Sequence, residues 1–289
     1  MIRQIEVPQG QLAVETTGDD AAPPVVLLHS GVADRRMWDG VVPALAERYR
    51  VVRHDMTGFG ESTPPTGPYR NTDDLLAVLD AVGAPRAAVI GSSFGGLVSL
   101  AFAVERPERV AALGLLAAPL PDHDWSAAMA EYAAAEEAAL ARADLDAAVS
   151  SNLDMWVRGP ARSWDETLRR HAATVREAMR VALANQQLTE THERGDLPDV
   201  DAALAGLGVP TLVAVGEDDL PDFHTIADRL ARSIRGAAGP HRLPAVGHLI
   251  PVEQPAVTAE LLRTFLDGLD TFDAPAGRAS RDDPAGLGR

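Results

Sequence analysis

The hydrophobic residues of the chain fall into short runs of the kind that form β-strands. Two of these runs, VVLLH and TLVAV, are continuously apolar, which is typical of strands buried on both faces of a mostly parallel sheet. With other segments of similar length, they predict strands at Ile2–Val7, Gln11–Thr17, Pro24–His29, Tyr49–Asp55, Ala87–Gly91, Val110–Leu116, Thr211–Gly216 and His241–Leu243.

Between several of these strands, apolar residues recur at positions i, i+3, i+4 and i+7, the spacing of one helix face. This spacing predicts helices in MWDGVVPALAE, NTDDLLAVLDAVG, SFGGLVSLAFAVE and AVTAELLRTFLDGL, the second of which closes on Gly83. Strands that alternate with helices predict an α/β fold, a doubly wound and mostly parallel sheet of eight strands. Ligands bind such sheets at the carboxyl ends of the strands.

The pattern changes between residues 121 and 205, where alanine-rich helical segments replace the strands. One of them, SWDETLRRHAATVREAMRVALANQQ, begins with Ser163 and Glu166 in the spacing of a capping box, which predicts its start. We expect residues 1–120 and 206–270 to form the core, and residues 121–205 to form a helical lid over its active edge. Residues 271–289 are rich in Gly, Pro, Asp and Arg without periodicity, which predicts a disordered tail.

Candidate catalytic residues follow three of the predicted strands. In GSSFGG, Gly91 and Gly95 bracket Ser93 at a strand-to-helix turn, the Gly-x-Ser-x-Gly arrangement that presents a nucleophile. A serine needs a histidine base and a carboxylate that orients it, and GHLIPVEQP and GEDDLPDF supply His248 and Asp219. The chain order is therefore serine, aspartate, histidine.

In this order and on this framework, the chain resembles the α/β-hydrolases from about residue 24 to residue 269. Four motifs carry the resemblance: LLHSG, HDMTGFGES, GSSFGG, and the late GEDD with GHLIPVEQP. The family pattern favours Asp219 over its neighbours Asp218 and Asp222, while some members place the acid one strand earlier, where this chain has Asp122 and Asp124.

The resemblance also implies an oxyanion hole. One donor is the backbone N–H of Phe94, and the other comes from the loop after LLHSG, with Gly31 as the candidate and Val32 as the alternative. The corresponding family histidine, His29 here, supports that loop rather than reacting.

Substrate contacts are expected from Trp38, near the start of a core helix, and from Trp156 with Arg158 in the predicted lid. Serine at the turn argues against the dehalogenase and epoxide hydrolase branches, in which the resemblance implies an aspartate. HSGVADRRMWDG and the helical insert are most similar to the branch of 3-oxoadipate enol-lactonases and small-molecule esterases. We therefore expect hydrolysis of a small carboxylic ester or lactone through an acyl-serine.

Other reactions on the same three residues stay open at this point: hydrolysis of carbon–carbon bonds or thioesters, perhydrolysis, and lyase chemistry without a cofactor. A different class of hypothesis is a small-ligand binding protein in which the three residues are vestigial.

Composition further limits the partners and the reaction chemistry that we expect. The net charge of −16 makes a nucleic-acid partner unexpected, since phosphate backbones are anionic. All 26 basic residues are arginine, which excludes Schiff-base chemistry on lysine and is typical of GC-rich bacterial genomes, and cysteine is absent. The sequence shows no secretory signal or apolar run long enough for a bilayer, so we expect a cytoplasmic monomer or homodimer acting on a small molecule, with no membrane partner, metal or cofactor.

Overall fold

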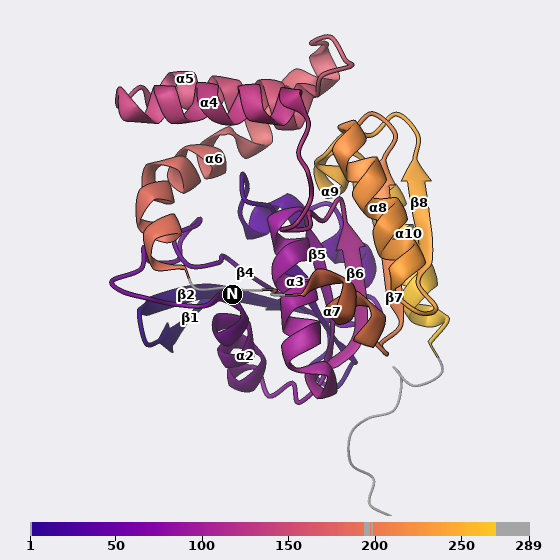
Figure 1. Cartoon of the computed structure of the whole chain (residues 1–289). Helices are drawn as coiled ribbons and strands as arrows, with labels where there is room; N and C mark the ends of the chain where they lie inside the picture. The colour runs from indigo at the N-terminus through magenta and orange to yellow at the C-terminus, as the bar shows by residue number, and fades with distance from the viewer. Residues whose placement is uncertain (1, 194–196, 198, 270–289) are drawn as a thin grey trace, which may run out of the picture.

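An eight-stranded sheet forms the centre of the molecule in the computed structural model, which describes residues 2–193, 197 and 199–269 (Figure 1). The spatial order of the strands is β1-β2-β4-β3-β5-β6-β7-β8. β2 pairs antiparallel with β1 and β4, and the other neighbours are parallel. The strands are β1 Ile2–Val7, β2 Gly10–Thr17, β3 Pro24–Leu28, β4 Arg50–His54, β5 Ala87–Ser92, β6 Val110–Leu116, β7 Thr211–Gly216 and β8 Ala238–Leu243.

Every residue of β5, β6 and β7 is buried, as their continuous apolar runs predict. The helices outside the insert are the 3₁₀ turns η1 Arg35–Trp38 and η2 Pro107–Arg109, with α1 Val42–Leu45, α2 Asn71–Ala81, α3 Phe94–Glu105, α8 Pro221–Ser233, α9 Ile250–Glu253 and α10 Pro255–Asp267. α1 contacts α10, and α3 contacts α2. The sequence prediction of a doubly wound, mostly parallel sheet of eight strands is confirmed.

Most of the chain between β6 and β7 forms helices that lie above the sheet in Figure 1, where α4 and α5 run side by side and α6 descends toward the core, whereas the last helix of this segment lies beside α3. These elements are α4 Ala127–Ala141, α5 Leu145–Asn152, the π-helical turn η3 Leu153–Arg158, α6 Glu166–His192 and α7 Val200–Gly206. The first four of these elements pack around a second apolar cluster that includes Val149, Leu153, Val157 and Met179, whereas α7 packs against the main core. None of the described helices is long and apolar enough to cross a membrane.

Two sequence expectations differ from the structure, and a third is not tested by it. The helix predicted in MWDGVVPALAE is interrupted at Gly40, where an added Cβ would lie 2.6 Å from Pro255 Cβ, so only η1 and α1 form. α6 starts at Glu166 with Asp165 as its cap, whose side chain accepts Leu168 N–H at 2.7 Å, and the capping box predicted at Ser163 is wrong. The predicted tail, 271–289, lies outside the described residues.

Candidate active site

Ser93 sits at a sharply strained turn between β5 and α3. Its backbone has φ 52° and ψ −121°, a conformation that L-residues rarely adopt. The flanking glycines are required by close backbone approach, since a Cβ on Gly91 would lie 2.1 Å from Gly95 O and one on Gly95 would lie 2.4 Å from His29 O. This turn presents the Ser93 hydroxyl at the carboxyl end of β5.

The side chains of Ser93, His248 and Asp219 form one hydrogen-bonded chain. His248 Nε2 lies 2.8 Å from Ser93 Oγ, and His248 Nδ1 lies 2.9 and 3.1 Å from the two Asp219 oxygens. The Asp219 and His248 side chains are almost fully buried, and Leu220 N–H also donates to Asp219 Oδ1 at 2.8 Å. With Nδ1–H directed at the carboxylate, Nε2 is free to accept the serine proton.

Two of the four other carboxylates that the sequence left open, Asp222 and Asp122, have different partners. Asp222 accepts bonds from Ser126 N–H and Ser126 Oγ–H, each at 2.8 Å, and Asp122 forms a bidentate pair with Arg229. Within the part of the chain that the structure describes, Asp219 is the carboxylate that contacts the His248 ring.

The loop after β3 lies opposite the start of α3. Gly31, Val32 and Phe94 all line the cavity at Ser93. Phe94 opens α3, where backbone N–H groups have no acceptor within the helix. Two separate segments, the loop after β3 and the start of α3, thus border the same cavity as Ser93.

His29 connects the loops after β3 and β4. It is fully buried, with its Nδ1 2.8 Å from Ser30 O and its Nε2 accepting Met56 N–H at 2.9 Å. Burial lowers the pKa of His29, so the ring stays neutral with Nδ1–H donating to the carbonyl. This arrangement fixes the backbone next to Gly31 without bringing His29 into contact with Ser93.

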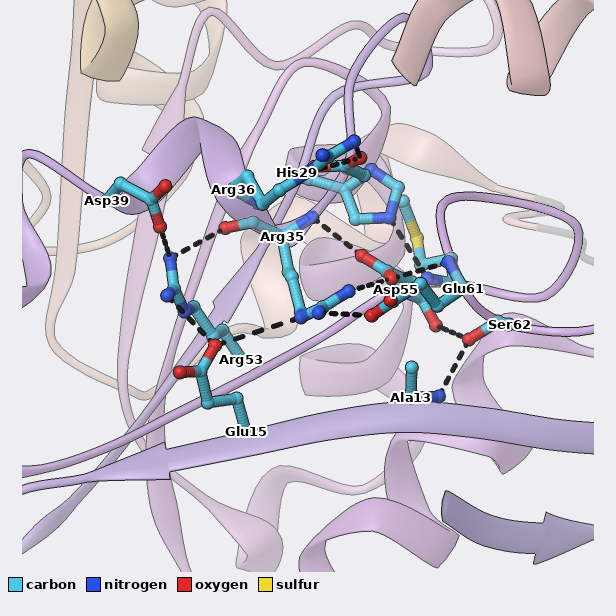
Figure 2. A network of polar contacts seen from close by, with 12 residues as sticks. Ala13, Glu15, His29, Arg35, Arg36, Asp39, Arg53, Asp55, Glu61 and Ser62 are labelled. Carbon is cyan, nitrogen blue, oxygen red and sulfur yellow. Dashed lines mark hydrogen bonds and ion pairs between the residues drawn. The ribbon is translucent and has the colours of Figure 1, made fainter. Parts of the chain in front are cut away.

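A buried ion-pair network supports the same region (Figure 2). Figure 2 shows Arg35 with Asp55 and Glu61 on one side and Arg53 on the other. Asp55 also accepts Arg35 N–H and Glu61 N–H, each at 2.8 Å. Gly60 has φ 50°, and a Cβ there would lie 2.3 Å from Asp55 Oδ2. The motif HDMTGFGES thus encloses a carboxylate that ties two loops together.

A cavity of about 270 Å³ opens at Ser93 and His248 and is walled on its other side by residues of the helical segment. The Trp156 ring lies 4.6 Å from the His248 ring, and the Phe223 ring lies 4.4 Å from it. Trp156 Nε1–H donates to the Tyr132 hydroxyl at 2.9 Å. Core and helical segment therefore both contribute to the space in front of the serine.

The structure does not bring all expected substrate contacts to this cavity. Trp38 is fully buried in the core and does not line the cavity. Arg158 binds Asp154 Oδ1 at 3.0 Å and the carbonyls of Gly159 and Arg162, and it also lies outside the lining. Trp156 lines the cavity.

Several lining or packing residues escaped the sequence analysis. Phe223 belongs to α8, whose pattern FHTIADRLARS carries apolar residues at helical spacing and could have been recognised. Tyr132 and Glu136 lie four residues apart in an alanine-rich helix, on one face, and polar residues at that spacing were the available signal. No group of three or more His, Asp or Glu side chains in the described ranges is placed to hold a metal ion.

Comparison with known proteins identifies the family. A model described as the alpha/beta hydrolase fold matches residues 23–255. A 2-hydroxymuconate semialdehyde hydrolase from Pseudomonas sp. (strain CF600) is 30% identical over 269 residues, which cover 86% of this chain and 88% of that relative. The chain belongs to the α/β-hydrolase family and is an enzyme with hydrolase activity of that type.

Two solved structures extend the comparison. A thermophilic esterase from Thermogutta terrifontis superposes with a TM-score of 0.75 at 27% identity, covering 94% of this chain and all (100%) of that one. An enol-lactonase from Burkholderia xenovorans LB400 gives a TM-score of 0.73 at 24% identity, covering 92% of this chain and 100% of its own, and shows the shared fold alone.

Proposed function

We propose that this enzyme hydrolyses a small carboxylic ester or lactone through an acyl-serine intermediate. The observation that carries the proposal is the hydrogen-bonded chain from Ser93 Oγ through His248 to the buried Asp219 carboxylate. In this arrangement Ser93 is the nucleophile, His248 the general base and Asp219 the acid that holds the imidazole.

The reaction proceeds in two halves. His248 Nε2 takes the Ser93 proton while Oγ bonds to the substrate carbonyl carbon, and the resulting oxyanion accepts N–H donors from Phe94 and from Gly31 or Val32. Collapse breaks the carbon–oxygen bond, and His248 returns the proton to the alcohol oxygen, which in a lactone stays attached to the acyl group. Water then attacks the acyl-serine with His248 again as base, and release of the acid restores Ser93. Removing one oxyanion donor would cost about 10²–10³ in rate.

We assign residues 121–205 as a lid on a core of residues 1–120 and 206–270. The cavity supports this division, because Ser93 and His248 come from the core while Trp156 and Leu183 come from the insert. Closing a site with such an insert excludes water and orients the substrate. Action in the cytoplasm as a monomer or homodimer stays a prediction.

Carbon–carbon bond hydrolysis is the second candidate, and the name of the Pseudomonas relative favours it. A semialdehyde has no ester bond, so hydrolysis of 2-hydroxymuconate semialdehyde must break a bond between carbons. The same nucleophile and base serve both reactions. The two are separated by comparing kcat/KM for 2-hydroxymuconate semialdehyde with kcat/KM for p-nitrophenyl butyrate.

The experiment for the main proposal compares the two adjacent serines. Ser93→Ala should lower kcat/KM on p-nitrophenyl butyrate by at least about 10³-fold, because the attacking oxygen is lost. Ser92→Ala is the matched control, since Ser92 is buried in β5. A fluorophosphonate should label Ser93, as located by mass spectrometry. Failure of both labelling and ester hydrolysis would instead support a binding protein with a vestigial site.

A further inference from the structure

Several acidic side chains line the cavity in front of Ser93. Glu136, Glu190 and Glu193 line it together with His248. Among the described residues of the lining, none is an arginine, although arginine supplies all 26 basic residues of the chain. Ser93 and His248 define the reactive part of this cavity, and the three carboxylates add negative charge to the space in which a substrate would bind.

Glu136 is held in place by neutral donors. Its Oε2 accepts the Tyr132 hydroxyl at 2.5 Å and the side-chain amide of Asn152, and its Oε1 accepts Gln186 Nε2–H at 3.1 Å. Burial and the Glu136 charge raise the pKa of Tyr132, which therefore stays a neutral donor. These contacts orient the carboxylate without cancelling its charge.

The position of Glu136 relative to the base follows from a short chain of contacts. Tyr132, which donates to Glu136, accepts Trp156 Nε1–H at 2.9 Å, and the Trp156 ring lies 4.6 Å from the His248 ring. Glu136 is thus separated from the base by two aromatic side chains that line the same cavity.

The remaining carboxylates come from the carboxyl end of α6. Gln186 and Glu190 lie four residues apart on one face of α6, and Glu193 directly follows the helix as its cap residue. Gln186 Nε2–H donates to Glu190 at 2.8 Å. A helix carboxyl end carries partial negative charge, so acidic residues there are unfavourable for stability. Helix stability therefore does not favour this placement, although Glu193 also accepts Asn71 Nδ2–H at 2.8 Å.

Aromatic rings complete the lining. Phe59, Tyr69, Phe94, Tyr132 and Trp156 all contribute to the wall. The faces of such rings attract cations through their quadrupoles, and carboxylates nearby add to the attraction. The aromatic rings and the carboxylates each favour the binding of a positively charged group, and neither favours the binding of an anion.

We propose that the substrate is an ester or lactone that carries an ammonium group, which binds between the Glu136 carboxylate and the aromatic wall. The proposal rests on the hydrolase function inferred above. It also disfavours substrates that carry a carboxylate, including an enol-lactone acid and 2-hydroxymuconate semialdehyde, because the lining repels their charge.

The test uses three p-nitrophenyl esters of matched size. The acyl groups are 4-(trimethylammonio)butyryl, its uncharged isostere 5,5-dimethylhexanoyl, and the monoanion of adipic acid. We expect kcat/KM for the cationic ester to exceed that for the neutral isostere by about tenfold or more, with the anionic ester lowest. A cationic-to-neutral ratio of one or less, with the neutral ester hydrolysed, would overturn this inference and leave the esterase proposal standing.

Substitutions of the cavity carboxylates test whether these residues cause the preference for the cationic ester. Glu136→Gln should lower the cationic-to-neutral ratio about fivefold or more, and Glu190→Gln should lower it by a smaller factor. Glu137→Gln is the matched control on the same helix, because Glu137 is exposed and outside the lining, and its ratio should change less than about twofold. Equal effects of Glu136→Gln and Glu137→Gln would overturn the assignment.

A binding measurement keeps the inference testable if none of the esters is hydrolysed. Calorimetric titration of the Ser93→Ala variant with the methyl esters of the cationic and neutral acyl groups compares their affinities directly. Tighter binding of the cationic ester, lost in the Ser93→Ala/Glu136→Gln double variant, supports the charge selectivity even where the esterase proposal fails. Equal affinities would contradict it.

Discussion

Arg162 and Glu253 form an ion pair between the helical segment and α9, the short helix that follows the loop carrying His248. Arg162 Nη1 lies 2.5 Å from Oε2 of Glu253, whose side chain is only 3% exposed. The same carboxylate oxygen accepts Gly247 N–H at 3.0 Å, directly before His248. Arg162 also donates to the Val157 carbonyl at 2.8 Å, one residue after the tryptophan that packs on the His248 ring. The pair therefore couples the two sides of the cavity.

We predict that Arg162→Met lowers the free energy of unfolding by about 3 kcal/mol, because it leaves the buried Glu253 carboxylate without its counter-charge. Denaturant unfolding measures this loss. Adding Glu253→Gln should recover about 1–2 kcal/mol of it, since the amide oxygen still accepts Gly247 N–H without carrying a charge. The pH profile of kcat/KM should shift in Arg162→Met, because the loop next to His248 loses its support.

Arg158→Met is the matched control for that prediction. Arg158 lies in the same segment, but its ion pair with Asp154 is partly exposed, and such pairs contribute about 0–1 kcal/mol. If Arg158→Met and Arg162→Met destabilised the protein equally, the coupling assigned to Glu253 would be incorrect.

The acid of the proposed mechanism is tested at two adjacent residues. Asp219→Asn should lower kcat on p-nitrophenyl butyrate by about 10²–10⁴-fold, because the amide can hold His248 in the wrong tautomer. Asp218→Asn should stay close to wild type, since Asp219 is the residue whose oxygens contact His248. The reverse pattern would move the acid to Asp218.

The strained turn at Ser93 predicts a stability difference between two inactive variants. The free energy of unfolding of Ser93→Gly should exceed that of Ser93→Ala by about 1 kcal/mol, because glycine adopts φ 52° and ψ −121° without a Cβ clash. Thermal unfolding of both variants measures the difference. The same pair of substitutions at Ser92, in the extended β5, should show the opposite order, with glycine less stable by about 0.5–1 kcal/mol. The same order at both positions would argue against stored strain at Ser93.

Local signals explain why the fold was predictable. Strands such as β6 and β7 are marked by continuous apolar runs, and the structure confirms both with the predicted bounds. Where a tertiary contact decides the structure, the sequence pattern fails, as at Gly40, whose close approach to Pro255 interrupts a predicted helix.

The cavity was less accessible to sequence reasoning, because its polar residues meet across long separations. Glu136 and Gln186 are fifty residues apart, and the pairing of Arg162 with Glu253 spans ninety-one. The sequence predicted that Arg158, which is close to Trp156 in the chain, contacts the substrate, yet its guanidinium binds Asp154 and two carbonyls instead. Motif spacing identifies residues that share a local turn, and it carries no information on which charged side chains from distant segments meet in the fold.

A buried carboxyl away from the cavity gives a pH-dependent prediction. Asp74 lies in the first turn of α2 and accepts the Thr57 hydroxyl at 2.6 Å. Burial raises the pKa of Asp74 to about 6 from its ordinary value of 3.8, an effect that the Thr57 hydrogen bond only partly offsets. A raised carboxyl pKa means that the folded state binds more protons than the unfolded state between these values, so Asp74 costs stability as the pH rises through that window.

We therefore predict that Asp74→Asn is stabilising at pH 7 and has little effect near pH 3.5, where wild-type Asp74 is protonated in both states. The pKa difference sets an upper limit of about 3 kcal/mol for the gain. The lost attraction between a carboxylate and the amino end of α2 reduces this limit by about 0.3–1 kcal/mol, so we expect a gain of at most about 2–2.7 kcal/mol. Denaturant unfolding of both proteins from pH 3.5 to 7.5 measures the difference, which should grow between pH 4 and 6 and then level off.

Asp73→Asn is the control, because Asp73 is exposed and pairs with Arg106 at the surface. A difference for Asp74→Asn that stays flat across the same pH range would show that Asp74 ionises in the folded protein as easily as in the unfolded chain.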